Sequence, residues 1–228
     1  MSGVRRPLRA LSTVLIIAGV LMLVDAAMTV AWQEPVSGLY AKIVQGRLGD
    51  DLHRLELEKP SAVELAALNA LKGESRRMAF LARRLRTTAH PGAAVGRIRI
   101  PKIHASFVVV NGTDTVSLRK GPGIYDEVPF PGAPGTTAIA GHRTTYLAPF
   151  RRIDQLVRGD AITIEMPYGR FTYEVQKRRI VAPTEISVIK RVGYDRLVLS
   201  ACHPLYSAAK RIVVFARLVG AQARGAAV

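Results

Sequence analysis

The sequence contains a single cysteine in 228 residues, so no disulfide can form within one chain. Aromatic residues are few, at 6%, and 17 Asp plus Glu stand against 33 Lys plus Arg. We find no helix-turn-helix, zinc-finger spacing or ribonucleoprotein motif, so nucleic acid is not an expected partner despite the net charge of +16. The basic excess favours an anionic membrane surface or an acidic polymer as partner, or simply a solvated surface.

The N-terminus carries a long apolar stretch behind a basic tail. From Leu8 to Trp32 the only charged residues are Arg9 and Asp25. Residues 1–9 are therefore predicted to be a cytoplasmic basic tail and residues 10–32 a transmembrane signal-anchor, with Trp32 at the interface. Basic residues before the span predict that the remainder of the chain lies outside the cell. A cleaved signal peptide, cut near Ala26, is the alternative.

Residues 33–90 are predicted to form a helical spacer. Leucine and isoleucine recur there at loosely helical spacing, and Pro60 interrupts the pattern. Ser61 and Glu64 have the spacing of a capping box, which predicts the start of a second helix that continues to about Leu85. The arginines and lysines of this helix either contact lipid headgroups or wall polymer, or form a solvated face.

The pattern changes after His90-Pro91-Gly92, where apolar residues begin to alternate. Short strands separated by Gly/Pro-rich connections indicate an all-β barrel or sandwich over residues 91–220, followed by a tail at 221–228. Asn111-Gly112 predicts a tight turn, and the Tyr146–Val157 stretch predicts a short helix or an irregular crossover. The predicted strands are 95–100, 107–110, 138–141, 161–166, 171–181, 197–201 and 212–218.

Three residues at the ends of these predicted strands have side chains that can carry out acyl transfer. Cys202 ends an apolar run, His142 follows another, and Arg211 opens the last strand. A thiolate attacks a carbonyl, an imidazolium protonates a leaving amine, and a guanidinium donates to a developing oxyanion. Cys202 and Arg211 would lie at the same barrel end if their strands are neighbours. Taken alone, a single Cys is more often a small core residue than a nucleophile.

The segments IAGHRTTYLAPFRRID and LVLSACHPLYSAAKRIVVFAR resemble the two signature regions of sortases, and most closely those of class E. The resemblance covers roughly residues 94–218. It implies an eight-stranded β-barrel behind a membrane anchor. It also implies that Cys202 is the nucleophile, with His142 and Arg211 as the other catalytic residues.

The same resemblance assigns substrate-binding roles to Ala201, Tyr146 and His203. The family usually shows Thr-Leu-x-Thr-Cys at the nucleophile, whereas this chain has Val198-Leu199-Ser200-Ala201-Cys202. Ala201 therefore lacks a hydroxyl that touches substrate in relatives. The Tyr146-Leu147 pair also differs from the Tyr-Gly usual in class E, and we expect it to narrow the pocket mouth.

The implied activity is that of a membrane-anchored cysteine transpeptidase. Such an enzyme cleaves the Thr–Gly bond of an LAxTG- or LPxTG-like signal at the C-terminus of a secreted protein. It then joins that protein to an amine of a peptidoglycan precursor (lipid II). No cofactor and no metal are expected, since one Cys cannot build a zinc site.

Three alternatives remain open at the level of sequence. The first is a sortase-fold protein that binds sorting signals or wall polymer without turnover. The second is a membrane-anchored structural protein whose basic helices bind anionic polymer. The third is a hydrolase that ends the reaction with water.

Overall fold

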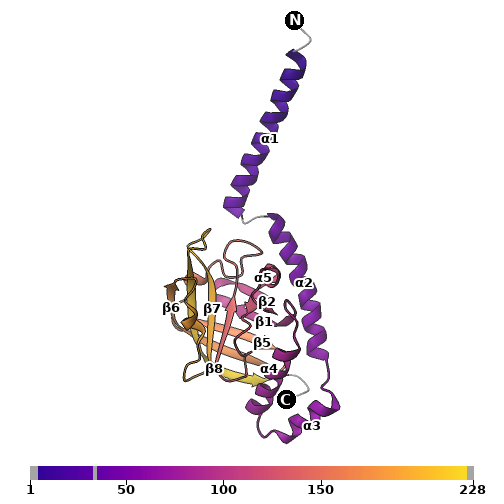
Figure 1. Ribbon diagram of the computed structural model, residues 1–228, viewed down its shortest axis with the longest axis vertical. Coiled ribbons are helices and arrows are strands. Elements are labelled where there is room, and N and C mark those ends of the chain that lie inside the picture. The colour runs from indigo at the N-terminus through magenta and orange to yellow at the C-terminus, as the bar shows by residue number, and fades with distance from the viewer. Residues whose placement is uncertain (1–4, 33–34, 225–228) are drawn as a thin grey trace.

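The computed structural model describes residues 5–32 and 35–224. A long helix, α1 (Arg5–Trp32), stands clear of the remainder, while α2 (Pro35–Leu57) runs alongside the β domain (Figure 1). Within the described residues, one helix is long and apolar enough to cross a membrane, over Arg9–Ala27, and none of that stretch is buried. Its length and composition fit a single-pass anchor and also a signal sequence.

Two further helices follow α2, where a single helix was predicted. They are α3 (Ala62–Ala70) and α4 (Glu74–Thr88). The predicted capping box is confirmed, because the Glu64 N–H donates to the Ser61 hydroxyl and the Ser61 N–H donates to the Glu64 carboxylate. The prediction of one continuous helix is wrong because Leu71 is extended and ends α3, and Gly73, with φ = +87°, takes a conformation that glycine tolerates just before α4 begins.

The β domain is a closed barrel with the strand order β1-β2-β3-β4-β7-β8-β6-β5. The predicted eight-stranded β-barrel behind an apolar helix and further helices is therefore confirmed. The first four strands are β1 (Ala94–Ile100), β2 (Ala105–Asn111), β3 (Gly123–Ile124) and β4 (Thr136–Ala140). The last four are β5 (Ala161–Met166), β6 (Gly169–Val181), β7 (Arg196–His203) and β8 (Lys210–Ala223). Three short 3-10 helices, η1 (Pro101–Ile103), η2 (Ile153–Gln155) and η3 (Ile186–Ile189), lie in the connections.

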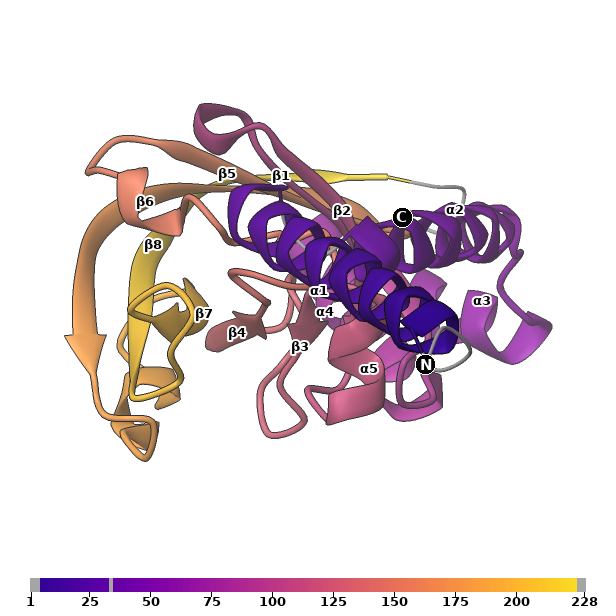
Figure 2. The ribbon, with the colours of Figure 1, turned by 90° about the horizontal axis from the view of Figure 1, so that it is seen from above.

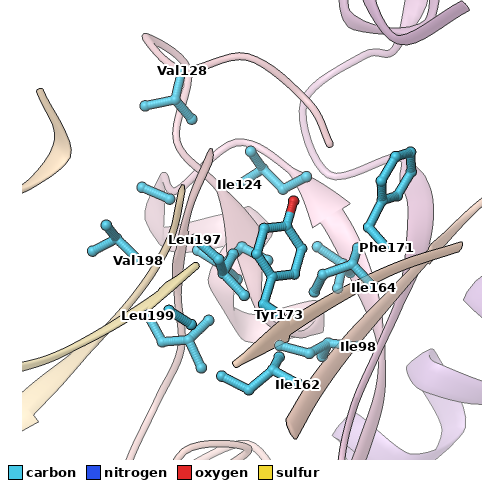
Figure 3. Close-up of a cluster of buried hydrophobic side chains, with 14 of the residues drawn as sticks. Ile98, Ile124, Val128, Ile162, Ile164, Phe171, Tyr173, Leu197, Val198 and Leu199 are labelled. Carbon is cyan, nitrogen blue, oxygen red and sulfur yellow. The ribbon is translucent and has the colours of Figure 1, made fainter. Parts of the chain in front are cut away.

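The barrel interior is filled by aliphatic side chains from opposite strands. In Figure 3 the ring of Tyr173 from β6 stands among Ile98 of β1, Ile162 of β5 and Leu197 of β7. All four side chains are buried. Burial raises the pKa of Tyr173 well above its ordinary value, so the phenol stays neutral. Helix α4 adds Met78, Leu81 and Leu85 to the same core.

The Asn111-Gly112 turn does not close a hairpin. After Gly112 the chain enters a short helix, α5 (Thr115–Lys120), and returns as β3, which runs parallel to β2. The Asp114 carboxylate accepts from the N–H groups of Val116 and Ser117 at 2.9 and 3.0 Å and so begins this helix. The short helix and the two-residue strand β3 were not predicted, because neither segment is long enough to show a periodic pattern.

Helix α2 is fixed to the barrel by one polar side chain and a small apolar cluster. The Gln45 amide accepts from the Val108 N–H at 2.8 Å and donates to the carbonyls of Val108 and Lys120 at 3.1 and 2.8 Å. Leu48 and Leu52 pack with Val108 and its neighbours in a second buried cluster. The amide thus continues the hydrogen bonding of β2 and holds the spacer against the barrel.

We predict that Gln45→Ala loosens α2. The change leaves the Val108 N–H and two carbonyls without their partner, which costs about 1–3 kcal/mol for a buried group. Hydrogen exchange of the full chain in detergent should show lower protection over residues 38–57 and at Val108. Gln155→Ala, at an exposed glutamine of η2, is the matched control and should leave the protection of residues 38–57 and of Val108 unchanged. Unaltered protection in Gln45→Ala would mean that the apolar cluster alone holds α2.

Candidate active site

The sequence-predicted catalytic residues lie at one end of three neighbouring strands. Strands β4 and β7 pair in parallel, with Ala140 opposite Ser200, and the Gly141 N–H donates to the Ser200 carbonyl at 3.0 Å. His142 therefore leaves the barrel beside the C-terminal end of β7, where Cys202 lies. Figure 2 shows β4, β7 and β8 on one side of the molecule.

Cys202 and Arg211 occupy directly opposite positions in the antiparallel pair β7–β8. Both side chains are half-buried. In this structure one Arg211 nitrogen, Nη1, donates to the carbonyls of Ala208 and Lys210 at 2.9 and 3.1 Å. These contacts hold the guanidinium at the start of β8, on the strand next to the thiol.

His142 is held by the loop that follows it. The Phe150 N–H donates to the His142 carbonyl at 3.0 Å, and the Phe150 ring covers Gly141. A Cβ at position 141 would lie 2.6 Å from that ring, so only glycine fits there without movement of Phe150. The Tyr146 ring lies 5.2 Å from the imidazole, centroid to centroid.

The electrostatic surroundings of His142 favour its neutral form. Burial lowers the pKa of the imidazole below its ordinary value, and the positive charge of Arg119 lowers that pKa further. Arg119 extends from α5, and its guanidinium carbon lies 6.0 Å from the centroid of the Tyr146 ring. The neutral imidazole can accept a proton, and the imidazolium, where it forms, gives its proton up more readily than that of an ordinary histidine.

A buried arginine next to His142 ties three segments together. Arg143 is 3% exposed. Its guanidinium donates to the carbonyl of Arg151 at 3.2 Å through Nη2 and to the carbonyl of Cys202 at 3.4 Å through Nη1. It also pairs with Asp154 at 3.0 Å and contacts Nδ1 of His203 at 3.3 Å. The loop carrying His142 is thereby fixed to the end of β7.

The three residues predicted to bind substrate have different surroundings. Ala201 is buried and belongs to the barrel core, whereas Tyr146 and His203 are half-buried beside His142 and Arg143. His203 also lines a cavity of about 340 Å³ together with Arg178 and Arg179. Their roles toward substrate stay predictions.

The loop after His142 has an unusual backbone. Tyr146, Leu147 and Ala148 have φ angles of +50°, +64° and +41°, in the left-handed region that disfavours side chains. Leu147 thus takes a conformation suited to the glycine common in class E sequences. Its side chain reaches toward α2, since a Cβ on Gly38 would lie 4.0 Å from the Leu147 Cδ2. The spacer therefore lies close to the loop of the site.

Sequence reasoning missed two residues that shape the site, Arg143 and Arg119. Arg143 directly follows His142, and that adjacency was the available signal. Arg119 lies on the unpredicted helix α5, so nothing in the sequence placed it near His142. Within the part of the chain that the structure describes, no group of three or more His, Cys, Asp or Glu side chains could hold a metal ion.

We predict that Arg143→Lys loosens the site although it keeps the charge. A lysine presents a compact ammonium and cannot reach the four partners of the planar guanidinium. The free energy of unfolding should fall by about 2 kcal/mol as buried acceptors lose partners. Alkylation of Cys202 by iodoacetamide should also become faster. The control is Arg158→Lys at an exposed arginine, and equal alkylation rates in the two variants would contradict the role given to Arg143.

We predict that Arg119→Gln raises the pKa of His142. The change removes the positive charge that disfavours the imidazolium, while the effect of burial stays. An NMR titration of the histidine ring protons measures this directly, and protonation of His142 should persist to higher pH. Arg83→Gln, at an exposed arginine of α4, removes the same charge elsewhere and should leave the titration unchanged. A downward shift in Arg119→Gln would refute the assignment.

Comparisons with known proteins identify the family to which the barrel belongs. The family model described as the sortase domain matches residues 98–219. Sortase D of Bacillus subtilis (strain 168) is 36% identical over 132 residues, a match that covers 56% of this chain and 65% of that protein. The chain thus aligns with somewhat less than two thirds of that relative's length.

Two solved structures of class E sortases are similar in fold and sequence. Sortase E from Streptomyces avermitilis is 31% identical with a TM-score of 0.54, and the match covers 59% of this chain and 93% of that chain. Sortase E1 from Streptomyces coelicolor, solved with a tripeptide in the active site, is 27% identical with a TM-score of 0.56. That match covers 60% of this chain and 94% of that one. With the family model spanning the barrel from β1 to β8, this chain belongs to the sortase family, with similarity to class E.

Proposed function

We propose that the protein is a cysteine transpeptidase in which Cys202, His142 and Arg211 carry the chemistry. The observation that carries the proposal is the strand register, in which Cys202 lies opposite Arg211 and next to the end of the strand that leads to His142. A nucleophile, an acid and an oxyanion donor are thus on three adjacent strands at one barrel end.

The first half of the reaction forms a thioester. The Cys202 thiolate attacks the carbonyl carbon of the scissile peptide bond, and Arg211 donates to the oxyanion that develops. His142 gives its proton to the leaving amine as the C–N bond breaks. To act, the Arg211 guanidinium exchanges its contacts with the carbonyls of Ala208 and Lys210 for the substrate.

The second half transfers the acyl group to an amine. The incoming amine attacks the thioester carbon, His142 accepts the amine proton, and the C–S bond breaks to return the thiolate. The lowered pKa of His142 keeps the imidazole available as a base in this half.

The proposed donor is an LAxTG- or LPxTG-like signal cut between Thr and Gly. We favour alanine at the second position because class E relatives do. Ala201 precedes the nucleophile where relatives carry a threonine hydroxyl, and its side chain is buried in the barrel core. This difference predicts an altered rate or signal preference.

The proposed acceptor is an amine of a peptidoglycan precursor, held near the outer surface of the cell membrane. The single apolar helix α1 supplies the anchor, with its basic end in the cytoplasm and the barrel outside. The net charge of +16 suits work beside anionic headgroups and wall polymer.

The test uses the full chain in detergent, because α4 contributes Met78, Leu81 and Leu85 to the barrel core and a fragment starting at residue 91 would expose it. The chain is incubated with LAxTG and LPxTG peptides plus an amine, and products are read by mass spectrometry. We expect cleavage between Thr and Gly with transfer to the amine, and a loss of at least about 1,000-fold in Cys202→Ala.

Three other outcomes discriminate between the alternatives. Cleavage without transfer at high amine concentration would identify a hydrolase. Binding of either peptide without cleavage, in a folded protein, would identify a non-catalytic binder, and the Ala201→Thr variant would then show whether the lost hydroxyl is the cause. Cleavage that persists in Cys202→Ala would refute the proposed nucleophile.

A further inference from the structure

A cationic cavity lies beside the loop that carries His142. It has a volume of about 280 Å³ and is bounded by the turn after β1 and by the segment that follows Tyr146. Its ionisable lining groups are His104, Arg151 and Arg152, and among the described residues that line it there is no carboxylate. A concave surface with guanidinium groups and no acid favours a carboxylate or phosphate as ligand. We call it the Arg151 cavity.

The guanidinium of Arg151 is only partly satisfied. Its Nη2 donates to the Tyr206 hydroxyl at 3.2 Å. Its Nη1 is buried and has no hydrogen-bond partner among the residues that the structure describes. A buried charged donor without an acceptor is costly and rare in folded proteins. An oxyanion in the cavity would supply the missing acceptor once the Arg151 side chain turned to bring this enclosed nitrogen to the cavity wall.

The cavity borders the loop that begins at His142, and Arg151 in its wall contacts the connection that follows Cys202. Leu147 and Ala148 line it and belong to the loop that His142 begins. Tyr206 lies in the connection from β7 to β8, four residues after Cys202. Arg143 donates to the carbonyl of Arg151 and to that of Cys202. The cavity therefore borders the loop that His142 begins, and Arg143 connects the backbone of Arg151 to that of Cys202.

We propose that the Arg151 cavity binds an anionic group, a carboxylate or a phosphate, of the acceptor that resolves the thioester. This inference rests on the proposed transpeptidase function. The incoming amine gives its proton to His142, so the acceptor approaches from the side of the His142 loop, where the cavity lies. An anchored oxyanion would orient the amine and raise its effective concentration at the thioester.

The experiment compares matched acceptor pairs with the full chain in detergent and an LAxTG donor peptide. Triglycine and triglycinamide differ by one carboxylate, and phosphoethanolamine and ethanolamine differ by one phosphate. We expect kcat/KM for transfer to favour the anionic member of one pair by about tenfold. The pair that shows the preference identifies whether a carboxylate or a phosphate is bound. In Arg151→Gln the preference should vanish.

The ratio of kcat/KM for the anionic acceptor to kcat/KM for its neutral counterpart is measured within each variant, so a general loss of rate cancels. Arg151→Lys keeps the charge and should restore part of the preference. Arg83→Gln removes an equal charge from an exposed position on α4, and this variant should show the full preference for the anionic acceptor. A preference that is absent from the wild type, or lost equally in Arg83→Gln, would overturn the proposal.

A binding measurement separates this inference from the proposed activity. Inorganic phosphate, compared with chloride at equal ionic strength, should raise the melting temperature of the wild type and of Arg83→Gln but not of Arg151→Gln. An equal rise in all three would place the anion elsewhere and overturn the inference. If no donor peptide is cleaved, the proposed function fails, and the phosphate shift still decides whether Arg151 holds an anion.

Discussion

The parallel pairing of β4 with β7 is the constraint on which the candidate site depends. It brings the end of β4 beside the end of β7, and the Gly141 to Ser200 hydrogen bond extends it to the residue before His142. The antiparallel pairing of β7 with β8 then sets Arg211 opposite Cys202. Because the barrel is closed, a slip of one register would displace neighbouring strands as well, so the three residues are held together by the whole sheet.

Arg143 extends this constraint from the strands to the loops. Strand pairing fixes only the backbone up to Gly141, and the segment beyond it has no ladder of its own. The buried guanidinium of Arg143 links that segment to the Cys202 carbonyl, to Asp154 and to the carbonyl of Arg151. The loop that positions His142 and borders the Arg151 cavity therefore depends on one charged side chain with several fixed donors.

Helix α2 is packed against the barrel and is not a free tether. Gln45 of α2 binds the Lys120 carbonyl at the end of α5, and the adjacent Arg119 acts on His142 through its charge. Leu147, on the loop of the site, reaches toward Gly38 of α2. Helix α2, which follows the apolar helix α1 and runs beside the barrel (Figure 1), thus approaches the surroundings of the site at two points.

The sequence by itself determined the all-β class, the apolar helix and the Ser61 capping box, because alternation, hydropathy and capping spacing are local signals. The motif residues also predicted the trio Cys202, His142 and Arg211 and, through the family resemblance, the barrel. The sequence did not reveal α5, the break at Gly73 or the left-handed loop at Tyr146–Ala148, since short or strained segments are stabilised by their neighbours and not by their own pattern. Only the tertiary structure decided the surroundings of the site. The contacts of Arg143 and the charge of Arg119 near His142 join residues far apart in the chain, and only the closed barrel brings them together.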